Sequence, residues 1–477
     1  AGERVTLAGR LLQTRDFGKL MFAPLVDRSG RMQIGFQRDQ LAAWWPDRKL
    51  LDGGDLVGVT GQLGHTQKGE PTLWAHEVQL LAKSLAPPPE KWHGLADKEL
   101  RYRRRYVDLW ASEGVREVFV KRSQVLSTIR RFLEGEGYLE VETPTLHPIA
   151  GGAAAKPFTT HHNALDMELY LRIAPELYLK RLIVGGLERV FEVSRNFRNE
   201  GLSPRHNPEF TMLELYEAQA DYRRMMELTE RMFELAARAV NGSTKTTFRG
   251  KDYDLAAPFA RVTYAELFER VAGFPLHPLD DTKLRAKAAE KGLALDPGAA
   301  KNAPNTPAAR ELARWKLADN VLEACITDEL EGPIFITDYP VAISPLAKRK
   351  PGSDWLTERF EVYVAGMELG NAFSELNDPA EQAARFEEQV ASKDPEAPGE
   401  VDWDYVQALE YGMPPAGGLG IGIDRLVMVL TNQDSIRDVL LFPAMKPVAN
   451  SESASELAPV ERTSNASAAN SPTAPRQ

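Results

Sequence analysis

Apolar and polar residues alternate in five short runs over the first eighty residues, which is the pattern of half-buried β-strands. The five predicted strands are 4–12, 19–27, 31–37, 55–63 and 72–81. One or two helical turns are predicted at 38–45, after the third strand. Five strands with a helix after the third is the order of an OB-fold, a barrel that binds single-stranded oligonucleotides. Any other small β-barrel module fits the pattern equally well.

The rest of the chain mixes helical and strand periods. The predicted elements are helices over 115–136 and 222–240, a strand over 138–142, two strands joined by a polar loop over 189–218, a hairpin over 359–376 and a loop or small insertion over 294–309. Gly137 suits the left-handed end of the first helix, and Gly366 suits the turn of the hairpin. Strands followed by helices, beside a small barrel, indicate an α+β chain of more than one domain.

The 477 residues carry a net charge of −10, which taken whole argues against a nucleic-acid partner. The charge is unevenly distributed: residues 91–131 hold 11 basic and 5 acidic side chains, and residues 132–477 hold 36 and 53. Cys325 is the single cysteine, which excludes an intramolecular disulfide and a thiolate zinc site. No apolar run reaches the ~18 residues that span a bilayer, and no secretory signal pattern is present, so we expect a cytoplasmic protein. The chain starts almost within a strand and without methionine, so we expect an upstream segment.

Two segments differ in composition from the rest. Pro87-Pro88-Pro89 predicts an extended linker that leads to the arginine-rich run 101–106. That run either follows a phosphate backbone or is a solvated hinge whose arginines pair with acidic residues. Residues 448–477 contain too few apolar side chains to offset their ordering entropy and are predicted to be disordered.

Candidate chemistry gathers on the strand predicted at 209–217. Counting by twos, Phe210, Met212, Glu214 and Tyr216 share one face, while the leucines between them face the core. A carboxylate and a phenol on one face of a central strand are costly unless something polar binds there. The preceding strand and loop add Arg195, Arg198, Glu200, Arg205 and His206. Arginines clamp phosphate and aromatic rings stack on bases, so the set indicates a nucleotide site.

The hairpin over 359–376 carries Glu361, Glu368, Asn371 and Glu375. Two carboxylates beside a triphosphate would hold Mg²⁺, and the others would suit a cation. Asn371 and Glu375 fall on the same face of a regular strand, and Glu368 falls on the other face. A bulge near Gly370 is therefore required to bring all three to one side. The alternative is an exposed acidic edge strand.

Five segments resemble bacterial-type class II lysyl-tRNA synthetases. They are 173–181, 195–200, 205–211, 370–377 and 418–425, and the likeness runs from about residue 4 to 447. The three class II signatures fall at 137–144, 195–217 and 418–425. Met367 and Ala372 stand where we expect Arg and Gly.

The resemblance implies an N-terminal OB-fold β-barrel, an antiparallel six-stranded catalytic sheet flanked by helices, and a homodimer. It implies four segments: an anticodon-binding domain at 1–83, a linker at 84–106, a catalytic domain at 107–447 and a disordered tail at 448–477.

The resemblance also implies roles for individual residues. Arg198 and Arg425 would be catalytic, holding the α- and γ-phosphates of ATP, and Phe210 would stack on adenine beside Glu200 and His206. Glu361 and Glu368 would bind Mg²⁺. The residues implied to bind lysine are Gly152, Glu176, Glu214, Tyr216, Asn371 and Glu375. Those implied to read the anticodon are Arg15, Phe22, Gln33 and Glu77.

The activity implied is ATP-dependent activation of L-lysine and its transfer to tRNA(Lys). One alternative is the same fold acting on another amino acid or on a protein acceptor. An aspartyl or asparaginyl enzyme would need cationic groups facing the substrate side chain, whereas these candidates are acidic. The other alternative is a non-catalytic OB-fold protein that binds RNA.

Overall fold

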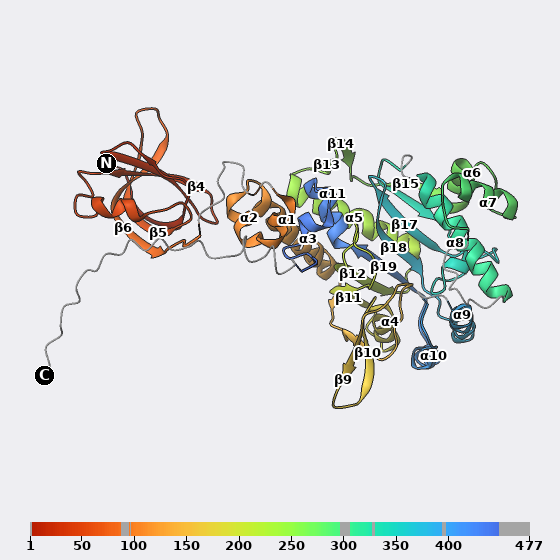
Figure 1. Ribbon diagram of the computed structural model, residues 1–477. Helices are drawn as coiled ribbons and strands as arrows, with labels where there is room; N and C mark the ends of the chain where they lie inside the picture. The colour runs from red at the N-terminus through yellow and green to blue at the C-terminus, as the bar shows by residue number, and fades with distance from the viewer. Residues whose placement is uncertain are drawn as a thin grey trace. The chain divides into compact units, whose positions relative to one another are not determined.

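The computed structural model describes residues 2–86, 95, 97–295, 306–326, 330–393 and 397–447. The described residues divide into two compact units, one from residues up to 113 with 445–447 and one from residues 114–444 (Figure 1). The prolines 87–89, most of the predicted insertion and the predicted tail lie outside the described residues.

The first unit is a closed barrel. Its described strands follow the order β1-β5-β6-β4-β3-β2, and β1 also pairs with β3, which closes the sheet. The strands are β1 (Arg4–Leu11), β2 (Arg15–Asp16), β3 (Leu20–Val26), β4 (Arg31–Gln37), β5 (Leu56–His65) and β6 (Pro71–Ala82). Ile34, Phe36 and Val57 are fully buried inside it. The five strands predicted from alternation are confirmed.

The helical turns predicted at 38–45 are wrong in position. Residues 38–44 form bends and turns, and the helix is the 3₁₀ helix η1 (Trp45–Leu50). Pro46 lies in its first turn, where a fixed φ and a missing N–H favour the start of a helix.

Two short helices, α1 (Lys98–Arg103) and α2 (Arg105–Ala111), carry the arginine-rich run. Arg101 and Arg105 both pair with Asp108, at 2.9 and 2.7 Å, and Arg105 is buried. Arg103 pairs with Glu99 at 2.6 Å. These pairs favour the interpretation in which the arginines neutralise neighbouring acids.

The second unit is built on one large sheet. Eight strands of its described residues follow the order β15-β16-β17-β18-β19-β12-β11-β7. They are β7 (Leu139–Glu140), β11 (Arg189–Phe197), β12 (Glu209–Ala218), β15 (Ala260–Thr263), β16 (Ile334–Thr337), β17 (Arg359–Val364), β18 (Met367–Ser374) and β19 (Ala416–Gly422). The strand pair over 189–218 and the hairpin over 359–376 are confirmed, whereas the strand expected at 138–142 is shorter.

The expected antiparallel six-stranded sheet is correct for the centre and incomplete at the edges. From β16 to β11 all neighbours are antiparallel, but β15 pairs parallel with β16, and β7 pairs parallel with β11. Helices lie between the partners along the chain in both cases, and such crossovers are what parallel pairing requires.

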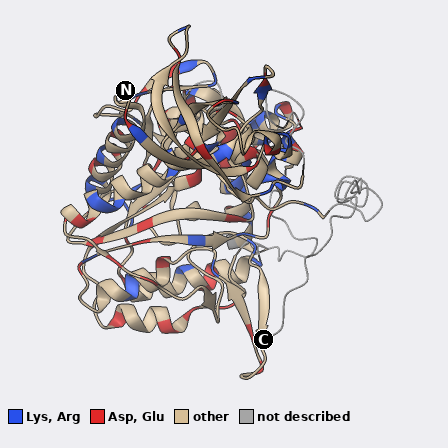
Figure 2. Ribbon diagram, turned by 90° about the vertical axis from the view of Figure 1, so that its left-hand side faces the viewer, with Lys and Arg blue, Asp and Glu red and all other residues tan. Residues whose placement is uncertain are grey.

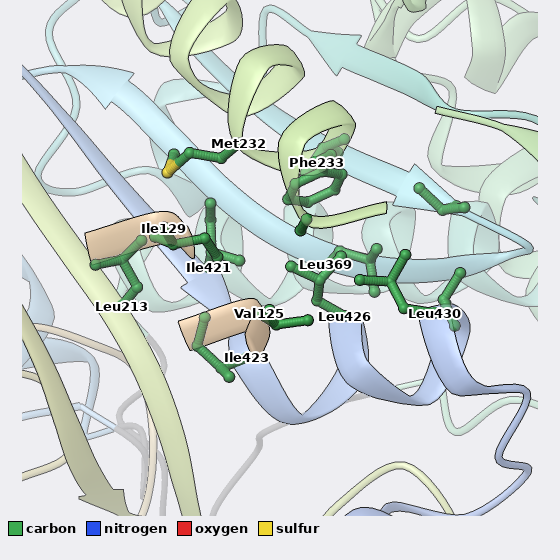
Figure 3. Close-up of a cluster of buried hydrophobic side chains, with 14 of the residues drawn as sticks. Val125, Ile129, Leu213, Met232, Phe233, Leu369, Ile421, Ile423, Leu426 and Leu430 are labelled. Atoms are coloured by element: carbon green, nitrogen blue, oxygen red, sulfur yellow. The ribbon is translucent and has the colours of Figure 1, made fainter. Parts of the chain in front are cut away.

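Helices cover both faces of this sheet. One face carries α3 (Val115–Gly135), α5 (Tyr222–Asn241) and α11 (Ile423–Thr431), whose apolar side chains form a core with Leu213, Leu369 and Ile421 (Figure 3). The two predicted helices are therefore confirmed, and Gly137 has the left-handed φ expected after α3. The other face packs against α4 (Glu176–Val184), α9 (Pro379–Ser392) and α10 (Trp403–Glu410).

Smaller elements complete the unit. They are β8 (Leu146–His147), β9 (Thr159–His162), β10 (Met167–Leu171), β13 (Lys245–Phe248), β14 (Lys251–Asp254), η2 (Val341–Ile343), α6 (Tyr264–Ala272), α7 (Asp281–Glu290), α8 (Pro307–Ile326) and α12 (Ile436–Val439). Acidic and basic residues are interspersed over helices and strands (Figure 2). Of the helices in the described part of the chain, none is both long and apolar enough to cross a membrane.

Candidate active site

A cavity of about 450 Å³ opens on the sheet. Phe210, Met212, Glu214 and Tyr216 of β12 line it, while Leu213 and Leu215 are fully buried in the core below. Because side chains alternate along a strand, the cavity lies on the face opposite α3 and α5. The prediction that these four alternate residues share one face of the strand is confirmed.

A β-bulge gathers the acidic residues of the hairpin. Val362 pairs with Gly370 and Tyr363 with Glu368, which leaves Leu369 as an extra residue in β18. Glu368 and Asn371 consequently line the same cavity, together with Glu361 of β17. The bulge predicted near Gly370 is confirmed, and the hairpin is not an exposed edge, since β19 covers its other side.

Arg359 connects Glu361 and Asn371 of the hairpin. It donates to Glu361 Oε1 at 2.6 Å and to Asn371 Oδ1 at 3.0 Å, and its guanidinium lies over the Tyr339 ring at 4.4 Å. Burial and the neighbouring Glu368 carboxylate raise the pKa of Glu361 to about 7. Glu361 and Glu368 therefore place two carboxylates in one cavity, an arrangement suited to a cation.

A second group of residues suits an anion and a flat ring. The guanidinium of Arg198 lies 5.1 Å from the Phe210 ring centre, and its Nε has no hydrogen-bond partner among the described residues. Arg425 donates to Glu368 Oε2 and to His206 Nε2, both at 3.0 Å. Burial and Arg425 lower the pKa of His206, so its ring is a neutral acceptor. Glu200 also lines the cavity.

The remaining cavity residues form a buried acidic group. Gly152, Glu176, Glu214 and Tyr216 line this end, and burial, reinforced by Glu176, raises the pKa of Glu214 to about 8. Glu375 does not line the cavity surface: it lies behind, 1% exposed, paired with Lys180. This cluster of carboxylates suits a ligand with positive charges at more than one position.

Mg²⁺ fits the Glu361 and Glu368 pair. Magnesium in nucleotide sites takes one or two carboxylates and completes its shell with phosphate and water oxygens. No cluster of three or more histidine, cysteine or acidic ligands occurs in the described part of the chain, so these residues offer no all-protein cage.

Comparison with known proteins agrees with this geometry. The family described as tRNA synthetases class II (D, K and N) matches residues 97–446, and the OB-fold nucleic acid binding domain matches residues 5–84. The lysine–tRNA ligases of Moorella thermoacetica and Carboxydothermus hydrogenoformans are each 52% identical to this chain. They cover 94% and 93% of it, and the matches span 89% of each relative. That of Chromobacterium violaceum is 52% identical over 93% of this chain and 87% of its own length. The chain belongs to the lysine–tRNA ligase family.

Membership of the lysine–tRNA ligase family confirms the resemblance, the OB-fold and the enzyme class predicted from the sequence. It disfavours the generic barrel and the non-catalytic RNA-binding protein. ATP use follows from the same family.

In the barrel, three of the four residues expected to read RNA lie together. Arg15 pairs with Phe22 across β2 and β3 and donates to Gln33 Oε1 at 2.7 Å. Glu77 lies on β6 and makes an exposed ion pair with Arg4 at 3.0 Å instead.

Several residues beside the proposed contacts of the cavity and of the barrel were not predicted from the sequence. The ring centre of Trp74 lies 5.8 Å from that of Phe22. The ring centre of Phe17, a residue that is 67% exposed, lies 6.4 Å from that of Phe22. Arg359 could have been found two positions before Glu361, on the same strand face. Lys180 could have been found one helical turn after Glu176.

Proposed function

We propose that the protein activates L-lysine with ATP to lysyl-adenylate and transfers the lysyl group to the 3′ end of tRNA(Lys). One observation carries the proposal: a single cavity joins buried carboxylates at one end to Arg198, Phe210 and Arg425 at the other. Such a cavity suits a dicationic amino acid beside a nucleotide.

The proposed roles follow from this arrangement. Phe210 stacks on adenine beside Glu200 and His206, Arg198 binds the α-phosphate and the lysine carboxylate, and Arg425 binds the γ-phosphate. The α-amino group meets Glu176 and the backbone of Gly152. The ε-ammonium meets Glu214 and Tyr216 at the cavity wall and Glu375 just behind it, and Asn371 lies near the carboxylate. Glu361 and Glu368 would hold Mg²⁺, which supplies charge neutralisation on the phosphates.

The chemistry requires no protein base. The substrate carboxylate is already ionised and attacks the α-phosphorus, and pyrophosphate leaves. Arg198 offsets the charge that grows on the transferring group, and the rigid sheet aligns attacking and leaving oxygens.

The same proposal covers the organisation of the protein. Residues 1–83 form the anticodon-binding domain, 84–106 the linker and 107–447 the catalytic domain. The enzyme works as a cytoplasmic homodimer.

Amino-acid-dependent ATP–pyrophosphate exchange tests the activity. Among the twenty amino acids, we expect exchange with lysine, because an uncharged or anionic side chain would leave the acidic end unpaired. Exchange with aspartate or asparagine, or with no amino acid at all, would refute the proposal.

Replacing Phe22 with alanine is expected to separate the two half-reactions. Base stacking on an aromatic ring contributes ~1–3 kcal/mol, so KM for tRNA should rise roughly tenfold or more. Pyrophosphate exchange, which uses only the second unit, should keep its wild-type rate. Loss of both activities would instead indicate misfolding and count against the assignment of Phe22.

The pH dependence of lysine binding follows from Glu214. Its pKa of about 8 means that the carboxylate is mostly protonated at pH 7 and ionised at pH 9. The ε-ammonium of lysine, with a pKa near 10.4, stays charged over that range, whereas its α-ammonium loses its proton around pH 8 and above. We therefore expect KM for lysine to fall several-fold from pH 7 to 8 and not to fall further toward pH 9, while KM for ATP changes little. Steady-state exchange at half-unit pH steps measures this, and a flat lysine profile would contradict it.

A further inference from the structure

A lysine of the protein itself lies among the acidic residues of the cavity. The Lys180 side chain, on α4, is 0% exposed. Its ammonium donates to Glu176 Oε1 at 2.7 Å, forms an ion pair with Glu375 Oε2 and lies 5.3 Å from the Phe373 ring centre. Lys180 therefore bridges a carboxylate on the first turn of α4 to one that follows β18.

A fully buried ammonium is costly unless it is well paired, and apart from Glu176 the surrounding buried face of α4 is apolar. Leu177, Leu179 and Ile183 of the same helix pack in the adjoining core. Another apolar residue would fit that core, so the presence of a charged residue at position 180 needs a specific explanation.

The ion pair leaves part of Glu375 available. Its Oε1 atom is buried and has no hydrogen-bond partner among the described residues. Gly418 lies against it: a Cβ there would overlap Oε1 and come within 2.5 Å of the Tyr216 ring. Since Gly418 and Tyr216 both line the cavity, this oxygen lies just behind the cavity wall.

We infer that Lys180 is a positioning residue that fixes the separation of Glu176 and Glu375, and thereby selects the length of the diamino acid substrate. The inference rests on the proposed function, in which these two carboxylates receive the α- and ε-ammonium groups of lysine. Because Lys180 occupies one oxygen of each carboxylate, it holds them in place and leaves the other oxygens to the substrate.

Lys180 also sets the charge of the pair. The groups facing Glu375 are Lys180 and Glu176 from α4, Glu214 and Tyr216 from β12, and Tyr405 from α10. Burial raises the pKa of Glu375, and within this set Lys180 is the cation that opposes the rise. Without it, only acids and phenols face Glu375, so its pKa would rise further.

Lys180→Met tests the inference, since methionine keeps the length of the side chain and removes its charge. The assay is pyrophosphate exchange with lysine and with ornithine, which is one methylene shorter, at pH 7 and pH 9. We expect KM for lysine to rise at least about tenfold at pH 7, with KM for ATP unchanged. Because the pKa of Glu375 rises further without Lys180, the pH dependence of this KM should shift to higher pH than in the wild type. The lysine-to-ornithine ratio of kcat/KM should fall about tenfold, the scale of a one-methylene discrimination.

Lys287→Met is the matched control, because Lys287 forms an ordinary surface pair with Glu290 at 2.9 Å on α7. A folded Lys180→Met enzyme that matches this control in KM, pH profile and substrate ratio would overturn the inference. If Lys180→Met does not fold, Lys180→Arg tests the inference instead. Arginine keeps the charge, so the pH dependence of KM for lysine should stay as in the wild type. Its longer side chain would change the separation of Glu176 and Glu375, so the lysine-to-ornithine ratio of kcat/KM should shift. An unshifted ratio overturns the inference. A wild type without lysine-dependent exchange would instead overturn the proposed function.

Discussion

Replacing Arg198 with methionine should lower kcat for lysine-dependent pyrophosphate exchange about a thousandfold. Arg198 is half-buried, with its guanidinium over Phe210, and its buried Nε has no hydrogen-bond partner among the described residues, so the guanidinium is held ready for an anion. In the proposed reaction this anion is the α-phosphate, whose charge grows during attack. Losing one preorganised donor of this kind costs roughly 10²–10³ in rate, and here a full charge is lost as well.

Arg195→Met is the control for this variant. Arg195 lies on β11, three positions before Arg198, but contrary to the sequence-based grouping it does not line the cavity: its side chain is 47% exposed and its pair with Glu209 spans 3.6 Å. Exchange should stay within about twofold of the wild type in this control, as expected for a surface ion pair. If both variants lost activity equally, or if Arg198→Met changed KM for ATP and left kcat intact, Arg198 would have no role in the transition state.

Local patterns predicted those parts of the cavity that lie on a single strand or hairpin. The alternation along β12 put Glu214 and Tyr216 on one face, and the parity of β18 required the bulge that the register shows at Leu369. Both depend on the two-residue period of a strand, which is fixed by the backbone and independent of distant contacts.

Other parts depended on contacts between distant segments. That Glu375 lies behind the cavity wall follows from its pairing with Lys180, about two hundred positions earlier, and no local pattern reports that pairing. The parallel pairing of the two edge strands was missed for a similar reason: β15 was not predicted, and β7 was predicted as a strand without its partner. Each is short and takes its pairing from the helices that connect it to its partner.

Replacing Glu375 with glutamine should lower kcat/KM for lysine about a thousandfold and leave KM for ATP within about twofold. The change removes the charge proposed to meet the ε-ammonium and puts an amide in place of one carboxylate oxygen. It also leaves Lys180 with Glu176 as its remaining ion-pair partner in the described cavity. A site built around a polar partner loses ~10³–10⁵ in discrimination when the partner is missing, because the groups left behind stay buried and unpaired.

A matched control separates recognition from folding. Glu217 is also buried, accepts from Tyr138 at 2.6 Å and pairs with Arg189 at 2.9 Å, but faces the opposite side of β12 from Tyr216. Glu217→Gln should therefore lower the melting temperature by several degrees and leave both KM values near those of the wild type. Glu375→Gln should mainly affect lysine binding: lysine should no longer stabilise the protein against heat, whereas ATP still should. If the two variants weakened lysine binding equally, the effect at Glu375 would be one of stability, and the acidic end of the cavity would not be the amino-acid site.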